Sequence, residues 1–279
     1  MKAKAYGKVN LSLNVVKKRG DGYHELEMIM VPINLYDELT FKIADQMIYE
    51  CSDDSLVFDD NNTIVKAIKL MRDKYKFTNN FHIKLKKNIP MQAGLAGGSS
   101  NAAITLRLVN ELLNLNCSET ELYELGKKIG ADVAFCLYEK PALVTGVGDI
   151  IKPLDINIDF YLLLVKPREG ISTKEAFQKL DFSNIKHPDY RKVAKALSQG
   201  DYDDFINSIG NSLEEGAFKL MPNLVKLKQE LIDYGFDMAL MSGSGSTVFG
   251  ISKDALFVEQ ASEYFSKNYE FVRMVKVKK

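Results

Sequence analysis

Apolar and polar residues alternate strictly in the segment KVNLSLNV at 8–15. This period of two predicts a β-strand with one face buried in a core and a polar face in solvent. The segment FHIKLKK at 81–87 repeats the pattern, and residues 26–35 also appear extended after a GDG turn. In contrast, FYLLLV at 160–165 is continuously apolar, which predicts a buried strand.

Helical signals follow in three places. Apolar residues recur at helical spacing over residues 103–113, directly after a glycine-rich segment. Ser118 and Glu121 have the spacing of a capping box, so we expect a helix to begin there and to end near Gly130. A further helix is expected over residues 222–235, because proline stands near its start and glycine just past its end.

Strands and helices mix along the whole chain, which indicates an α+β protein. Residues 239–250 (ALMSGSGSTVFG) add a strand, a glycine turn and another strand. The length of 279 residues favours two domains. A glycine-rich stretch gives way to a new apolar strand near Pro153, so we expect the domains to be residues 1–153 and 154–279.

Composition and charge narrow the function classes. Lys and Arg total 37, as do Asp and Glu, and this balance argues against a general binder of nucleic acid or membrane surfaces. The apolar runs are far shorter than the ~20 residues that span a bilayer, and no signal or transit segment follows Met1. Three cysteines without metal-ligand spacing predict reduced thiols in a cytoplasmic protein. His82 and His187 lack ligand-spaced partners, so we expect no structural metal site.

The segment IPMQAGLAGGSSNAA at 89–103 is rich in glycine between a predicted strand and a predicted helix. Unpaired N–H groups and the positive end of a helix dipole would point into such a loop, which makes it a site for an anion. The loop is not a Walker A motif, because no lysine precedes Ser99, and it does not match G-x-G-x-x-G. Taken alone, glycines and serines here also fit a tight turn with a serine cap.

The wider segment PMQAGLAGGSSNAA resembles the phosphate-binding signature of the galactokinase, homoserine kinase, mevalonate kinase and phosphomevalonate kinase (GHMP) superfamily. The resemblance is closest to the 4-diphosphocytidyl-2-C-methyl-D-erythritol kinases. Further segments in that family's order are AKAYGKVNLSLNV, RGDGYHEL, IGADVAF, GISTKEAF and SGSGSTVFG. The resemblance implies an N-terminal domain like domain 2 of ribosomal protein S5 and a ferredoxin-like C-terminal domain.

The same resemblance implies an activity. It is ATP-dependent phosphorylation of the 2-hydroxyl of 4-diphosphocytidyl-2-C-methyl-D-erythritol, in non-mevalonate isoprenoid precursor biosynthesis. ATP is the co-substrate, and Mg²⁺ is expected to arrive with it. The protein is then expected to be a cytoplasmic monomer or weak homodimer with a small-molecule substrate, binding neither nucleic acid nor membrane.

Two residues match the family's catalytic pair. Lys8 matches the active-site lysine, and Asp132 matches the catalytic aspartate, which accepts or orients the proton of the substrate hydroxyl. Lys8 could also stabilise the transferring phosphoryl group. The pattern alone would make Lys8 an ordinary solvated lysine and Asp132 an N-cap.

The resemblance also implies the binding residues. For ATP they are Asn62, Pro90, Met91, Gln92, Ala93, Gly94, Leu95, Ala96, Gly97, Gly98, Ser99 and Ser100. For the substrate they are Asn10, Tyr23, His24, Thr173, Phe177, Gly243, Ser244 and Gly245. Tyr23 and Phe177 are expected to stack on cytosine, while His24 hydrogen-bonds its edge.

The sequence departs from the family's pattern at three positions. Gln92 and Ala96 stand where small residues or glycine are more usual, and Ala134 stands where proline is frequent. If Ala96 adopts a positive φ, the strain is about 1 kcal/mol. We expect reduced freedom of the loop rather than lost function.

Two other functions are compatible with parts of this pattern. A superfamily kinase acting on homoserine or mevalonate would have no base to stack on Tyr23 and Phe177. A non-catalytic ATP-binding sensor would have no need for Lys8 and Asp132.

Overall fold

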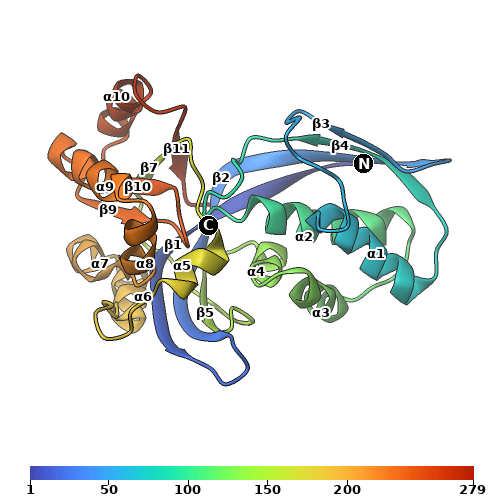
Figure 1. The fold of residues 1–279 in the computed structure, drawn as a ribbon, viewed down its shortest axis with the longest axis horizontal. Coiled ribbons are helices and arrows are strands. Elements are labelled where there is room, and N and C mark those ends of the chain that lie inside the picture. The colour runs from blue at the N-terminus through green and yellow to red at the C-terminus, as the bar shows by residue number, and fades with distance from the viewer. The chain divides into compact units, whose positions relative to one another are not determined.

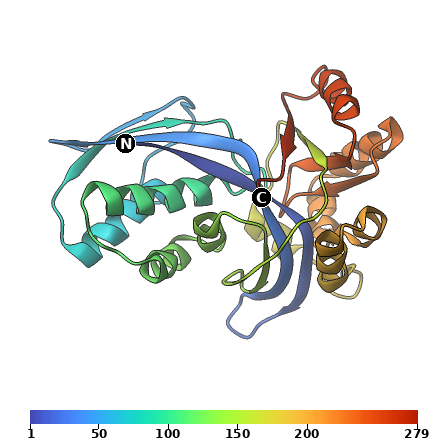
Figure 2. The same cartoon turned by 180° about the vertical axis from the view of Figure 1, so that it is seen from behind.

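The computed structural model describes residues 1–279, which form two compact units (Figures 1 and 2). Unit 1 comprises Met1–Gly7, Leu35–Ile89 and Ala96–Glu139, and unit 2 comprises Lys8–Asn34, Pro90–Leu95 and Lys140–Lys279. Each unit therefore collects three separate stretches of the chain. The expected domain boundary after residue 153 remains a prediction.

The strands are β1 (Lys2–Lys18), β2 (His24–Ala44), β3 (Ile48–Cys51), β4 (Asn80–Lys86), β5 (Ala142–Gly146), β6 (Ile150–Pro153), β7 (Tyr161–Lys166), β8 (Gly210–Asn211), β9 (Met238–Met241), β10 (Val248–Ser252) and β11 (Phe271–Lys276). The helices are α1 (Thr63–Tyr75), α2 (Gly97–Leu112), α3 (Glu119–Ile129), α4 (Val133–Tyr138), α5 (Thr173–Gln178), α6 (Tyr190–Gln199), α7 (Tyr202–Ser208), α8 (Glu214–Leu220), α9 (Asn223–Tyr234) and α10 (Ala255–Phe265).

Unit 1 is a sheet covered by helices. Its strands lie in the order β3-β4-β2, with β3 parallel and β2 antiparallel to β4. Helices α1 to α4 gather on one side of these strands (Figure 1). The core is apolar and includes the fully buried side chains of Phe41, Met71, Phe81 and Leu106. The predicted helix after the glycine-rich loop is α2, and its buried face belongs to this core.

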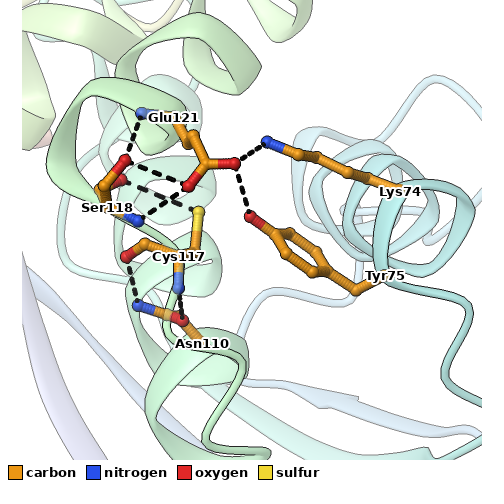
Figure 3. Close-up of polar contacts among 6 residues, drawn as sticks. All are labelled: Lys74, Tyr75, Asn110, Cys117, Ser118 and Glu121. Atoms are coloured by element: carbon orange, nitrogen blue, oxygen red, sulfur yellow. Dashed lines mark hydrogen bonds and ion pairs between the residues drawn. The ribbon is translucent and has the colours of Figure 1, made fainter.

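Helix α3 begins at the predicted capping box and ends before Gly130. The Glu121 carboxylate accepts the Ser118 N–H at 3.0 Å. The same carboxylate forms an ion pair with Lys74 Nζ of α1 at 2.5 Å and accepts the Tyr75 hydroxyl at 3.3 Å. Figure 3 shows these contacts. The contacts with Lys74 and Ser118 lower the pKa of Glu121 to about 2. Lys74 has the largest effect, and the N–H and hydroxyl of Ser118 add to it. One carboxylate therefore ties the end of α1 to the start of α3.

Helix α2 holds the loop that precedes this capping box (Figure 3). The Asn110 side chain accepts the Cys117 N–H at 2.9 Å and donates to the Cys117 carbonyl oxygen at 3.1 Å. All three cysteines of the chain are free.

Unit 2 contains a four-stranded antiparallel sheet in the order β11-β7-β10-β9. Strand β7 is the continuously apolar segment of the sequence, and residues 162–165 are fully buried, as predicted. Helix α9 packs on β9 and β10, and α10 packs on β7 and β11. Helix α9 ends at Gly235, whose φ is 118°, and the strand–turn–strand prediction for residues 239–250 is confirmed. In the same unit the first part of β2 pairs with β5, and β1 pairs with β8.

The prediction that β1 has a solvent-exposed polar face is wrong. Over residues 8–15 the polar side chains of β1 are as buried as the apolar ones, with exposures of 3% for Lys8, 1% for Asn10, 0% for Ser12 and 7% for Asn14. Buried polar groups need hydrogen-bond partners in place of water. Asn14, for example, donates to Glu27 at 2.9 Å and lies 2.7 Å from His187 Nδ1. Alternation along this strand separates an apolar core from a buried polar layer.

No helix combines the length and the apolar character that crossing a bilayer requires.

Candidate active site

A buried lysine and a serine meet on one backbone carbonyl in unit 2. Lys8 Nζ donates to the Gly94 carbonyl oxygen at 3.0 Å, and the Ser242 hydroxyl donates to the same oxygen at 3.0 Å. Lys8 Nζ also donates to Asn10 Oδ1 at 2.7 Å. The interpretation of Lys8 as a solvated lysine is therefore wrong. The structure brings together predicted residues from three distant parts of the chain.

Gly94 cannot be replaced without moving its neighbours. Its φ is +70°, and a Cβ at this position would overlap the Ser242 carbonyl group. Gly243, with φ +56°, covers the lysine from the other loop, since a Cβ there would lie 3.2 Å from Lys8 Nζ. Glycine supplies both the positive φ and the close approach of the two backbones.

The remaining residues of the glycine loop in unit 2 lie along residues 242–247, which we call the glycine–serine turn. Ser246 N–H donates to the Gln92 carbonyl at 3.3 Å, and Thr247 N–H donates to the Ala93 carbonyl at 3.4 Å. Gln92 is a non-glycine residue at φ 49°. Lys8 N–H donates to the buried Leu95 carbonyl at 3.1 Å. At the start of the loop, Pro90 is half-buried and Met91 is exposed.

Side chains that the sequence did not single out hold the glycine–serine turn. Asn211, 6% exposed, donates through Nδ2 to the carbonyls of Met241 and Gly243, each at 2.8 Å. Thr173 Oγ1 lies 2.8 Å from Ser244 Oγ, so these two predicted substrate residues do meet. At Gly245, with φ +85°, a Cβ would lie 2.8 Å from Met241 Sδ. A lone Asn between strand and helix gives no sequence signal of such a role.

A buried lysine orders the neighbouring segment. Lys166 Nζ donates to the carbonyls of Pro167 at 2.9 Å and of Arg168 and Glu169 at 3.2 Å. The Ser246 hydroxyl donates to the Glu169 carbonyl at 2.6 Å. Burial lowers the pKa of Lys166. The sequence gives no signal of this role, because Lys166 ends a strand, where an exposed side chain is the usual expectation.

The predicted base site pairs His24 with Phe177. Their rings stack with centroids 4.7 Å apart, and Phe182 lies 6.1 Å from His24 on a nearly parallel plane. Tyr23 is 65% exposed. Partial burial lowers the pKa of His24, and the nearby Lys18 ammonium lowers it further. A lowered pKa favours the neutral ring, which has one donor and one acceptor. Stacking of cytosine on Tyr23 and Phe177 stays a prediction.

In unit 1 the N-terminus of α2 presents backbone donors. Ala96 precedes this helix and adopts a positive φ of 56°. Its side chain provides no cap. The first intrahelical bond runs from the Ser100 N–H to the Ala96 carbonyl at 2.9 Å. The N–H groups of Gly97, Gly98 and Ser99 therefore have no intrahelical acceptor. Such an end is suited to phosphate.

Asp132 occupies the N-cap position of α4 but its side chain makes no cap hydrogen bond. The interpretation of this aspartate as a helix cap is therefore wrong. Its backbone is helical at φ −84° and ψ −6°, which turns the side chain away from the geometry of a cap. Nearby, a Cβ on Gly130 would lie 4.0 Å from Ser99 Oγ, so the segment that carries Asp132 passes the first turn of α2.

Asn62 has a structural role in unit 1. It caps α1 by accepting the Ile64 N–H at 2.9 Å, and its Nδ2 donates to the Val57 carbonyl at 2.9 Å. Next to it, the Thr63 hydroxyl donates to the Gly98 carbonyl at 2.7 Å. The contact of Asn62 with ATP stays a prediction.

The described residues contain no group of three or more His, Cys, Asp or Glu side chains that could hold a metal ion.

Both parts of the chain match family models. Residues 62–140 match the GHMP kinases N terminal domain, and residues 184–270 match the GHMP kinases C terminal model. The chain is 42% identical over 250 residues to 4-diphosphocytidyl-2-C-methyl-D-erythritol kinase of Bacillus cytotoxicus, which covers 89% of this chain and 86% of the relative. Identity to the Bacillus subtilis kinase of the same name is 43% over 251 residues, with the same two coverages.

The chain belongs to the 4-diphosphocytidyl-2-C-methyl-D-erythritol kinases, a family of GHMP kinases.

Solved structures agree with this family. A crystal structure of 4-(cytidine 5'-diphospho)-2C-methyl-D-erythritol kinase superposes with a TM-score of 0.85 at 28% identity, over 100% of both chains. Homoserine kinase from Cytophaga hutchinsonii has a TM-score of 0.74 at 19% identity, over 98% of this chain and 95% of its own, and shows the shared fold. The expected two-domain GHMP kinase fold is confirmed, and this kinase uses ATP as its co-substrate.

Proposed function

We propose that this kinase transfers the γ-phosphoryl group of ATP to the 2-hydroxyl of 4-diphosphocytidyl-2-C-methyl-D-erythritol, giving the 2-phosphate and ADP. The reaction belongs to non-mevalonate isoprenoid precursor biosynthesis. The observation that carries the residue assignment is the buried Lys8, held by Asn10 and by the Gly94 carbonyl of the glycine loop. Lysine is rarely as buried as Lys8, which is 3% exposed, unless its ammonium is held by polar partners.

Lys8 supplies the cation that the glycine loop lacks. Phosphoryl transfer relies on positioning and charge stabilisation rather than covalent chemistry by the protein. A preorganised ammonium in a water-poor site stabilises charge that develops on the transferring group. Hydrogen bonds to Asn10 Oδ1 and to the Gly94 carbonyl oxygen help to fix the direction of the ammonium.

Asp132 accepts the proton of the attacking hydroxyl or orients that hydroxyl for attack. This role is supported by the half-buried position of Asp132 at the start of α4. A positioned carboxylate of this kind typically contributes about 10²- to 10⁴-fold to the rate.

The first turn of α2 binds the phosphates of ATP through the N–H groups of Gly97, Gly98 and Ser99. A Mg²⁺ ion bound together with the nucleotide would neutralise part of the phosphate charge. It usually takes most of its ligands from phosphate and water and one or two from the protein. The Ser99 hydroxyl and the Asp132 carboxylate are oxygen donors of the type it prefers, so these residues fit the ion.

The substrate is held by the other predicted residues of unit 2. Tyr23 and Phe177 stack on cytosine, and His24 hydrogen-bonds the edge of the base and so selects it. The turn at residues 242–247 binds the diphosphate through N–H and hydroxyl groups. Asn10 and Thr173 contact the polyol or the diphosphate.

We keep residues 1–153 and 154–279 as the two proposed domains, and a monomer or weak homodimer as the proposed state. The three free cysteines support a cytoplasmic location. The equal numbers of acidic and basic residues argue against nucleic-acid binding.

A panel of acceptors in an ADP-release assay tests the reaction. We expect turnover with 4-diphosphocytidyl-2-C-methyl-D-erythritol and none with mevalonate or homoserine. Turnover of mevalonate or homoserine alone would overturn the substrate assignment. ATP binding without turnover of any acceptor would indicate a sensor instead.

A further inference from the structure

Asp37 of β2 is fully buried and binds the chain just before the glycine loop. Its exposure is 0%. Its Oδ1 accepts the N–H of Asn88 at 2.7 Å and that of Ile89 at 2.8 Å, while its Oδ2 forms an ion pair with Lys87 Nζ. One carboxylate thus holds three consecutive residues between strand β4 and Pro90.

The burial of this pair gives it a defined geometry. The Lys87 side chain is only 7% exposed, so neither charge is freely solvated. A buried carboxylate is tolerated when charged and N–H donors occupy its lone pairs, and here three donors do so. The contacts are charge-assisted, which makes them stronger than hydrogen bonds between neutral groups.

Two of the residues that Asp37 binds, Lys87 and Ile89, pack against Gly97, the first residue of α2. A Cβ on Gly97 would lie 2.9 Å from Ile89 Cγ2 and 3.2 Å from Lys87 Nζ. The loop leaves unit 1 after Ile89 and returns to it at Ala96. Both ends of the loop are therefore packed together on residues that the Asp37 carboxylate fixes.

We propose that Asp37 is a positioning residue for the nucleotide: by fixing residues 87–89 it sets the place of the α2 N-terminus and of its phosphate-binding N–H groups. The proposal rests on the proposed function of the glycine loop. Asp37 acts through the backbone and through Lys87, so it affects the affinity for ATP and leaves the affinity for the acceptor unchanged.

A set of variants tests this role. Asp37→Asn keeps the shape of the side chain and removes its charge, and Lys87→Met in the same chain removes the charge left behind. The double variant has no unpaired buried charge, so we expect it to be more stable than either single variant. Glu38→Gln is the matched control, because Glu38 is the next residue of β2 and pairs with Lys2 and Lys86 on the surface.

The readouts are the Kd for the non-hydrolysable ATP mimic AMPPNP, the KM values for ATP and for the acceptor, and the unfolding temperature. We expect the Kd for AMPPNP and the KM for ATP to rise at least tenfold in the double variant, with the acceptor KM within twofold of the original. Glu38→Gln should change neither. A residue that serves only stability would lower the active fraction and leave both KM values as they were.

A folded double variant that binds AMPPNP as tightly as the original chain would overturn the proposal. An equal rise in the KM for the acceptor would also overturn it. So would a Kd for AMPPNP that is no higher in the double variant than in Lys87→Met alone. If neither variant folds, amide hydrogen exchange of the unaltered chain decides: AMPPNP should slow exchange at Asn88 and Ile89, and unchanged exchange would refute the role. Since AMPPNP binding needs no acceptor, failure of the acceptor panel remains a separate result.

Discussion

Lys8 Nζ lies 3.0 Å from the carbonyl oxygen of Gly94, a residue 86 positions further along the chain. The contact joins the first strand to the glycine-rich loop within unit 2. Because both partners are buried or half-buried, the ammonium has a fixed direction before any ligand arrives. Such preorganisation is what makes an electrostatic contribution to catalysis large.

Replacing Lys8 with methionine should lower kcat by about 10²- to 10³-fold, since it removes a preorganised charge at the reacting group. The apolar stem still fills the buried site, but Asn10 Oδ1 and the Gly94 carbonyl lose a donor, so the unfolding temperature should fall as well. Lys17→Met on the exposed end of the same strand is the control and should keep the original kcat. Unchanged steady-state kinetics in Lys8→Met would remove this lysine from the mechanism.

Asp132→Asn should fold, bind ATP and acceptor, and lose about 10²- to 10⁴-fold in kcat, because the amide cannot accept the hydroxyl proton. Isothermal titration with each ligand and a steady-state assay provide the comparison. Since the Asp132 side chain does not cap α4, the helix should not be destabilised. Rates like those of the original chain would show that this carboxylate has no part in proton transfer.

Gly94→Ala should destabilise the fold and the loop together. The substitution combines a positive φ with an overlap on the Ser242 carbonyl, and strained φ positions alone cost about 1–3 kcal/mol. Gly98→Ala is the matched control, because its Cβ would make only an ordinary 3.5 Å contact with Thr63 Oγ1. Thermal unfolding should show a clear loss for Gly94→Ala and none for Gly98→Ala. Equal unfolding temperatures for the two would contradict the packing described for Gly94.

Phe177→Leu should raise the KM for the cytidylyl substrate and leave the KM for ATP unchanged. Stacking of one base on an aromatic ring is worth about 1–3 kcal/mol, or roughly a 5- to 150-fold change in affinity. Phe182→Leu should have a smaller effect, because its ring lies farther from His24 than that of Phe177 does. A loss for ATP instead of the cytidylyl substrate would mean that this ring does not serve the base.

Glu121 should contribute to stability in a pH-dependent way. Its pKa is lowered from 4.5 to about 2, so the folded state binds the proton more weakly than the unfolded chain does. The stabilisation is therefore complete above pH 4.5 and disappears as the pH falls towards 2. The difference in unfolding temperature between the original chain and Glu121→Gln should shrink over that interval.

Glu124→Gln, on the same helix, serves as the control for this titration. It removes an exposed ion pair with Lys127, and exposed pairs contribute only about 0–1 kcal/mol. Its unfolding temperature should stay close to the original at every pH. A Glu121→Gln difference that is constant from pH 6 to pH 2 would contradict the role of the carboxylate.

Local signals in the sequence predicted the elements well. The Ser118–Glu121 capping box, the end of α3 at Gly130 and the apolar strand β7 depend on neighbours in the chain, and the structure confirms them. The family resemblance pointed to the glycine loop and the turn at residues 242–247, and these two segments meet in unit 2.

Burial of polar residues could not be predicted in this way. Alternation placed Lys8 and Asn10 on a polar face, yet that face is covered by a turn more than 230 residues away. Asp37 and Lys166 have the sequence surroundings of ordinary surface residues, and only long-range contacts show that they are buried. Asn211 is similar, because its partners lie on strand β9 and the turn after it.

The interleaving of the two units has a consequence for synthesis on the ribosome. Every residue of unit 1 has been made once Glu139 is added, so its strands and four helices can assemble while half of the protein is still untranslated. Unit 2 cannot, since residues 8–34 must wait for β5 and β8 to emerge before they find their partners. During that interval β1 and β2 of the nascent chain can pair with each other but still expose apolar side chains that the finished unit buries, and this is the period in which a chaperone would have most to protect.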